Sequence, residues 1–79
     1  MKVRVDIVLK EGVLDPQGKA IGHALGSLGF KGIGEVRAGK VIEVEMTEKD
    51  PAKAKEMAKE MAEKLLANLV IEDYRISVL

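Results

Sequence analysis

The sequence predicts an α+β protein in which two helices cover one face of an antiparallel β-sheet. Three observations lead to this prediction. Alternating apolar and polar residues, typical of half-buried strands, occur at both ends of the chain and in its middle. Two stretches with helical periodicity lie between them. Each of these begins with Asp-Pro, at residues 15–16 and 50–51, a pair typical of helix starts.

The first half predicts a strand and a helix. Alternation from Lys2 to Lys10 indicates a strand with one buried face. A helix is expected from Pro16 to about Leu28, with Gly29 as its C-terminal stop. Its packing face should be the apolar stripe Ala20, Ile21, Ala24, Leu25 and Leu28.

A second stripe of that helix consists of Gly18, Gly22 and Gly26. Each glycine costs a helix up to about 1 kcal/mol relative to alanine, so the spacing needs a reason. Two interpretations stay open: another backbone approaches this face closely, or small residues are simply tolerated on a surface.

The second half predicts a hairpin, a helix and a final strand. The hairpin covers Ile33 to Met46 and turns at Val36-Arg37-Ala38-Gly39. The long helix opens at Asp50-Pro51, and the strand covers Val70 to Leu79. The helix should pack through Ala54, Met57, Ala58, Met61, Leu65 and Leu69.

This β-α-β-β-α-β order predicts a single-domain, two-layer sandwich of the ferredoxin-like type over residues 1–79. The sheet should have the spatial order 4-1-3-2, with both helices on one face. On the uncovered face, Lys2 and Arg4 should stand opposite Glu43 and Glu45 and form cross-strand ion pairs. A mixed charged and apolar face of this kind favours a protein interface.

Composition excludes several classes of function. Basic and acidic residues balance at 13 each, so a nucleic-acid or anionic-membrane partner is not indicated. There is no cysteine and no long apolar segment, which favours a cytoplasmic protein. Asn and Gln occur once each among abundant Lys and Glu, a trend of high-temperature proteins.

Gly18-Lys19 invites comparison with a phosphate-binding loop, but the pattern fails. Gly12 and Gly18 are separated by five residues instead of four, and Ala20 stands where the loop needs a hydroxyl. Pro16 also removes a backbone N–H from the cradle. The glycine cluster from Gly26 to Gly34 closes a helix, whereas a dinucleotide fingerprint opens one.

The residues therefore point to no catalytic, cofactor or metal site on this chain. His23, the sole histidine, has no evident nucleophile or ligand partner and is interpreted as a surface or interface residue. The central strands offer charges where an RNA-binding sheet offers aromatic residues. The function indicated by the residues alone is binding to another protein.

Two stretches go further: VLDPQGKAIGHALGSLGF at 13–30 and VRAGKVIEVEM at 36–46. With the chain length and element order, they closely resemble the PurS family, the small subunit of phosphoribosylformylglycinamidine synthase. The resemblance implies a non-catalytic subunit in purine biosynthesis that holds a glutaminase and a synthetase together. It also raises a role in ammonia transfer. It further implies a homodimer or higher oligomer, and a complex that uses ATP, magnesium and glutamine, with none of them bound by this chain.

Most residues that match the family pattern already have a structural role as cap, turn, helix stop or core. The candidates for the partner interface are Gln17, Lys19, His23, Lys40 and Glu43. The alternative function is a ferredoxin-like regulatory domain that binds a small metabolite at a dimer interface, for which the segment Gly26 to Gly34 is the supporting feature.

Overall fold

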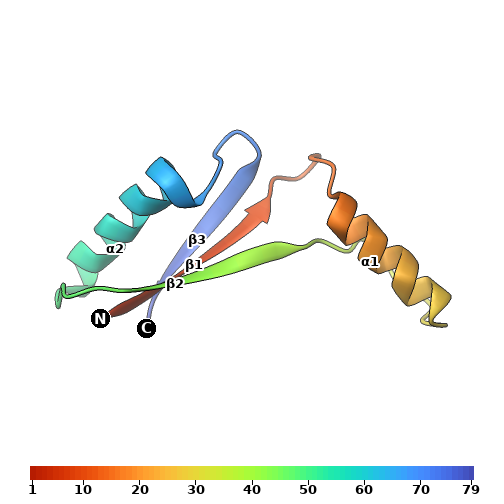
Figure 1. The fold of residues 1–79 in the computed structure, drawn as a ribbon, viewed down its shortest axis with the longest axis horizontal. Coiled ribbons are helices and arrows are strands. Elements are labelled where there is room, and N and C mark those ends of the chain that lie inside the picture. Colours follow the sequence, from red (N-terminus) through yellow and green to blue (C-terminus); the bar gives the residue numbers. More distant parts are fainter.

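The computed structural model describes residues 1–79 and has two parts, a sheet with one helix packed on it and an arm that projects away from the sheet (Figure 1). The sheet has the order β2-β1-β3, and both strand pairs are antiparallel. The elements along the chain are β1 (Lys2–Leu9), α1 (Pro16–Ser27), β2 (Gly39–Glu45), α2 (Pro51–Met61), the π-helical turn η1 (Ala62–Leu66) and β3 (Glu72–Val78).

The core lies between β1 and α2. The side chains of Val3, Val5 and Ile7 are at most 1% exposed, which confirms the predicted buried face of the first strand. The helix presents alanines to them: the predicted Ala54 and Ala58 are fully buried, as is Ala62, which was not predicted. Small side chains let the helix axis approach the sheet closely, so the core is built from β-branched residues on one side and alanine on the other.

The α+β class and the antiparallel sheet are confirmed. As predicted, the N-terminal strand β1 lies in the middle of the sheet, between β2 and β3. Two finer predictions were wrong. The hairpin over Ile33–Met46 does not form, because residues 31–38 belong to no strand. The sheet therefore has three strands instead of four, and the last member of the order 4-1-3-2 is missing.

The prediction that both helices cover the sheet was also wrong for this single chain. Helix α1 extends away from the sheet, and the chain returns alongside it to reach β2 (Figure 1). We call residues 15–38 the arm. The glycine face of α1 meets the returning chain: a Cβ atom at Gly18 would overlap the carbonyl oxygen of Val36, and one at Gly22 would contact the Val36 side chain at 3.4 Å. Val36 packs against this face, and residues 31–38 do not pair as a strand.

Close backbone approach is thus the correct interpretation at Gly18, whereas a Cβ atom at Gly26 would have no neighbour within 4 Å. The apolar stripe predicted to pack α1 is instead exposed, with Ile21 at 40% and Leu28 at 74%. The exposed side of α2 and η1 shows the same departure at Met57 and Leu65, which were predicted to pack.

The helix ends agree with the sequence signals. The carboxylate of Asp50 accepts the N–H of Ala52 at 3.0 Å at the start of α2. At the end of α1, Gly29 has φ of +94°, the N–H of Phe30 donates to the carbonyl of Leu25 and the N–H of Gly29 donates to that of Gly26. These two bonds form a Schellman motif, in which the residue after the helix, here Gly29, adopts the left-handed backbone conformation.

The projecting arm makes the chain unusually open. Its radius of gyration is 15.9 Å, whereas a compact domain of this length is expected near 12 Å. Its accessible surface is 5841 Å², against about 4,700 Å² for a monomeric protein of this mass. The excess of about 1,100 Å² exceeds the roughly 800 Å² that each partner buries in a standard protein interface.

Candidate interaction surfaces

A small cavity lies where the arm meets the sheet, and we call it the junction cavity. Its volume is about 220 Å³, and it brings together the predicted interface residues Gln17 and Lys40, which come from α1 and β2. The remaining lining residues are Ile7, Leu9, Asp15, Ala38, Gly39 and Glu72.

Asp15 organises this cavity. Its Oδ1 accepts the N–H of Gly18 at 2.8 Å, as expected of a helix cap, and its Oδ2 accepts the N–H of Ala38, also at 2.8 Å. These two backbone donors hold the pKa of the Asp15 carboxyl below its usual range, and the charge of Arg37 contributes. The carboxylate is therefore ionised at neutral pH and engaged by the backbone, which suits a structural clamp better than a proton donor.

The second hollow lies along the arm, between the glycine face of α1 and residues 32–36. Its volume is about 490 Å³. It contains the predicted interface residues Lys19 and His23, one turn apart on α1, together with Phe30 and Glu35. Lys19 and His23 thus line a different site from Gln17 and Lys40. Sequence reasoning could not foresee this division, because it depends on the path of residues 31–38.

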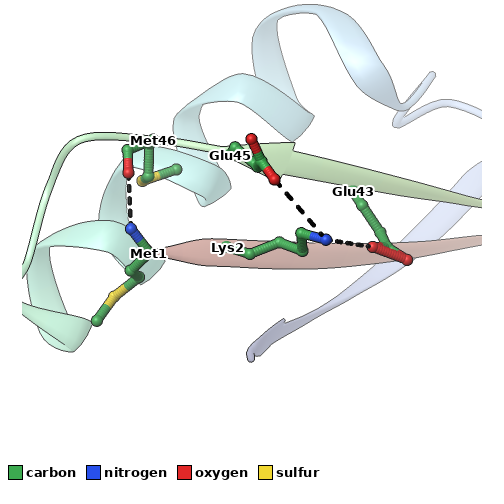
Figure 2. Close-up of polar contacts among 5 residues, drawn as sticks. All are labelled: Met1, Lys2, Glu43, Glu45 and Met46. Carbon is green, nitrogen blue, oxygen red and sulfur yellow. Dashed lines mark hydrogen bonds and ion pairs between the residues drawn. The ribbon is translucent and has the colours of Figure 1, made fainter.

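Glu43, the fifth predicted interface residue, lies on the face of the sheet that α2 leaves open. Figure 2 shows Lys2 between two acids of β2, with Nζ 3.4 Å from Glu43 Oε2 and 3.9 Å from Glu45 Oε1. The predicted cross-strand pairing is confirmed for Lys2, but Arg4 pairs instead with Asp6 of its own strand at 3.0 Å. Such exposed pairs are worth about 0.2–1 kcal/mol. Glu43 therefore already has a partner within the sheet.

The same figure shows the contact between the chain's first residue, Met1, and Met46, just after β2. The ammonium of Met1 donates to the carbonyl oxygen of Met46 at 2.7 Å, while the N–H of Met46 donates back to the carbonyl of Met1 at 2.9 Å. The ladder between β1 and β2 is therefore extended by one further pair of residues beyond the strands.

Sequence reasoning missed a pair of apolar surfaces, because it placed their residues in the core. One is the exposed stripe of α1 with Ile21 and Leu28. The other is a groove of about 390 Å³ along α2 and η1, lined by Met57, Met61 and Leu65. Each has the residues of a helix-packing face but lacks a second helix within the chain.

Two classes of site are not found in the structure. No group of three or more His, Asp or Glu side chains lies together in a way that could hold a metal ion. No helix has the length and apolar character needed to cross a bilayer.

The sheet, its packed helix and the two exposed helix-packing faces define an α+β protein of the ferredoxin-like class. The comparisons with known proteins then identify the family. The family model of PurS, described as phosphoribosylformylglycinamidine (FGAM) synthase, matches residues 2–79. The chain belongs to the PurS family, whose members are subunits of this ligase, as the resemblance in the sequence had implied.

Relatives and solved structures agree over nearly the full chain. The PurS subunit of Bacillus subtilis is 52% identical over 77 residues, which cover 98% of this chain and 90% of the relative. The crystal structure of PurS from Methanocaldococcus jannaschii, a subunit of formylglycinamide ribonucleotide amidotransferase in the purine biosynthetic pathway, has a TM-score of 0.86 at 49% identity and covers 96% of this chain and 92% of its own. A structure of PurLQS from Thermotoga maritima contains a chain with a TM-score of 0.88 at 32% identity, covering 99% and 95%. These matches confirm the ferredoxin-like prediction at the level of the fold class.

Proposed function

We propose that this chain is the assembly subunit of a phosphoribosylformylglycinamidine synthase in the cytoplasm. It bridges a glutaminase subunit and a synthetase subunit, and by holding them together it aids ammonia transfer between them. The complex uses ATP, magnesium and glutamine, which bind to the other subunits. The observation that carries this proposal is the likeness to a chain of the PurLQS structure over 99% of the length of this chain.

The projecting arm supports an assembly role. A single chain leaves the apolar stripe of α1 without a partner and exposes about 1,100 Å² more surface than expected for its mass. Burying apolar surface is worth about 25 cal/mol per Å², so an arm that stays free in solution forgoes a large stabilisation. The arm is therefore suited to packing on another chain.

We further propose that the first of these chains is a second copy. Lys55 and Lys59 lie on the flank of α2 that faces β3, and Met57 and Met61 lie on the opposite flank. That opposite flank faces the side of β2, where a ferredoxin-like sandwich has its other helix. The α1 helix of a second copy would fill this position, and the α1 helix of this chain would fill the equivalent position on the second copy.

Reconstitution tests the bridging role. The purified glutaminase and synthetase are mixed with glutamine, ATP and substrate, with and without this chain. Glutamine-dependent turnover should require the chain, whereas turnover with ammonium chloride should depend on it much less, because free ammonia needs no transfer between subunits. Equal glutamine-dependent turnover in both mixtures would contradict the proposal.

Variants in the junction cavity test which surface is used. Lys40→Glu and Gln17→Ala should each reduce the amount of synthetase retained by the immobilised chain, and Lys49→Glu, in the exposed loop before α2, should not. If both cavity variants retain as much synthetase as the natural sequence, the junction cavity is not the interface.

A second candidate function is a regulatory domain that binds a small metabolite. The hollow of the arm favours it, because glycines of α1 and of residues 32–34 line a volume of about 490 Å³, within the range of ligand pockets. Calorimetry against amino acids and nucleotides distinguishes the two functions. A tight, stoichiometric ligand would favour the regulator.

A further inference from the structure

The free edge of β3 runs beside a groove that none of the surfaces above includes, and we call it the β3 groove. It lies between α2 and β3 and has a volume of about 510 Å³. Since β3 is the last strand of the sheet, no strand of this chain covers it. The lining residues are Ala52, Lys55, Glu56, Lys59, Tyr74, Arg75 and Ile76.

The backbone of β3 offers hydrogen-bonding groups to this side. The bonds from Lys10 to Ile71 and from Leu79 to Lys2 fix the register in which alternate residues of β3 bond to β1. In that register the backbone N–H and C=O groups of Asp73, Arg75 and Ser77 point toward β1. The N–H and C=O groups of Tyr74, Ile76 and Val78 point to the free edge, whereas the N–H of Glu72 is bonded to the carbonyl of Asn68. Such a row of unpaired groups can accept an additional strand.

The rim of the β3 groove is basic. Lys55 and Lys59 are one turn apart on α2, with Glu56 as the single acid of the lining. Arg75 belongs to the lining through β3, but it pairs in register with Asp6, so its side chain lies on the opposite face of the sheet. None of these four residues takes part in any of the four ion pairs of the chain. Lysines at i and i+4 repel each other, and the two lysines of the rim outnumber its one acid, so the rim carries a net positive charge.

We propose that the β3 groove binds an extended, acidic segment of a partner protein, which adds to the sheet as a strand antiparallel or parallel to β3. Alternate side chains of an added strand point to the same face, so acidic residues at every second position would lie against Lys55 and Lys59. The backbone of the segment would bond to Tyr74, Ile76 and Val78.

A second copy of this chain fits the groove poorly. Its free strand edges are β2 and β3. The acids of β2, Glu43 and Glu45, lie on the open face of the sheet, away from the lysines of α2. On the face toward α2, β3 carries a single acid, Glu72. Its extended segment, residues 31–38, carries Lys31 and Arg37 with a single acid, Glu35. The charge of the rim therefore favours a different protein.

Nuclear magnetic resonance on the full chain tests this inference without the other subunits, so its failure is distinct from failure of the bridging role. The probe is the blocked peptide acetyl-Glu-Val-Glu-Val-Glu-Val-Glu-amide, and the control replaces each Glu by Lys. The acidic peptide should shift the amide signals of Tyr74, Ile76 and Val78 and slow their hydrogen exchange, with a dissociation constant of about 1 mM or lower. The basic peptide should leave them unchanged.

A charge-reversed variant sharpens the test. Lys55→Glu with Lys59→Glu should weaken binding of the acidic peptide by about tenfold or more. Lys49→Glu with Lys53→Glu changes the net charge equally outside the groove and should have little effect. The inference is overturned if the three amides show no response to the acidic peptide, if both peptides bind equally, or if these amides are already protected in the free protein by self-association.

Discussion

Asp15 and Ala38 stand 23 residues apart in the sequence, yet the Oδ2 atom of Asp15 accepts the backbone N–H of Ala38 at 2.8 Å. The same carboxylate caps α1 through Gly18, so one side chain joins the beginning of the arm to its end. Asp50 starts α2 with the same Asp-Pro pair, but its carboxylate bonds only within its own helix start, to Ala52. The repeated motif therefore has two different structural consequences.

Replacing Asp15 by alanine should loosen the base of the arm. Both bonds of the carboxylate would be lost, leaving the N–H of Gly18 and Ala38 without their acceptor. We expect lower helicity by circular dichroism and faster hydrogen exchange at the Ala38 amide. Asp50→Ala, which removes a cap in α2, should lower helicity as well but leave the exchange at Ala38 unchanged. Unaltered exchange at Ala38 in Asp15→Ala would contradict the clamp.

Acid should have the same effect as removing the carboxylate. The pKa of Asp15 is lowered in the folded state, mainly by the N–H groups of Gly18 and Ala38. The contribution of Asp15 is therefore complete above the unfolded pKa of about 3.9 and is lost as the pH falls through the lower folded value. The amide shift of Ala38 should titrate with a midpoint below about 3.9. Asp15→Asn should abolish this titration, and a midpoint at or above the usual value would refute the assignment.

Gly18 and Gly26 allow a matched test of the arm. A methyl group at Gly18 meets the carbonyl of Val36, while at Gly26 it meets nothing within 4 Å. Gly18→Ala gains helix propensity but forces the backbones apart, and it should lower the free energy of unfolding by about 1–2 kcal/mol. Gly26→Ala should raise it by up to about 1 kcal/mol. Urea denaturation measures both values; equal effects of the two substitutions would show that α1 does not pack through Gly18.

The parts of the fold that could be predicted are those encoded locally. Alternation identified the buried face of β1, and Asp-Pro identified both helix starts. The path of residues 31–38 could not be predicted, because it depends on a long-range contact. The backbone of Val36 approaches α1 at Gly18, where only a residue without a side chain leaves room for it. Hydrophobic periodicity shows which face of α1 seeks burial, but the same pattern results whether that face packs within the chain or on another chain.

The candidate surfaces likewise include residues that the sequence indicated and residues that it did not. The resemblance to PurS pointed to Gln17 and Lys40, and the structure brings them into one cavity. Their role as interface residues stays a prediction. The β3 groove left no signal in the sequence, because Lys55 and Lys59 lie beside the free edge of β3 only through the packing of α2 on the sheet.

Exchange of the arm between two copies predicts that Leu28 controls the oligomeric state. Leu28 is 74% exposed in the single chain, and burying a leucine contributes about 1.5–3 kcal/mol. Leu28→Lys should therefore weaken self-association by at least about tenfold, as measured by sedimentation equilibrium over a range of concentrations. Val41→Lys, at a position that is 52% exposed on the open face of the sheet, is the control. Identical association of Leu28→Lys and the natural sequence would exclude a role for this stripe.

The alanine face of α2 predicts that extra volume is harmful at a buried position between the helix and the sheet. Ala58 is fully buried and lies in a cluster with Val3 and Ala54. Leucine at this position has to push α2 away from β1 or adopt a strained rotamer, so Ala58→Leu should lower the free energy of unfolding by about 1–3 kcal/mol. Lys53→Leu, at an exposed position of the same helix, should change it by less than about 0.5 kcal/mol. Thermal and urea unfolding of the two variants measure the difference. If Ala58→Leu were as stable as Lys53→Leu, the close contact between α2 and the sheet would not exist in solution.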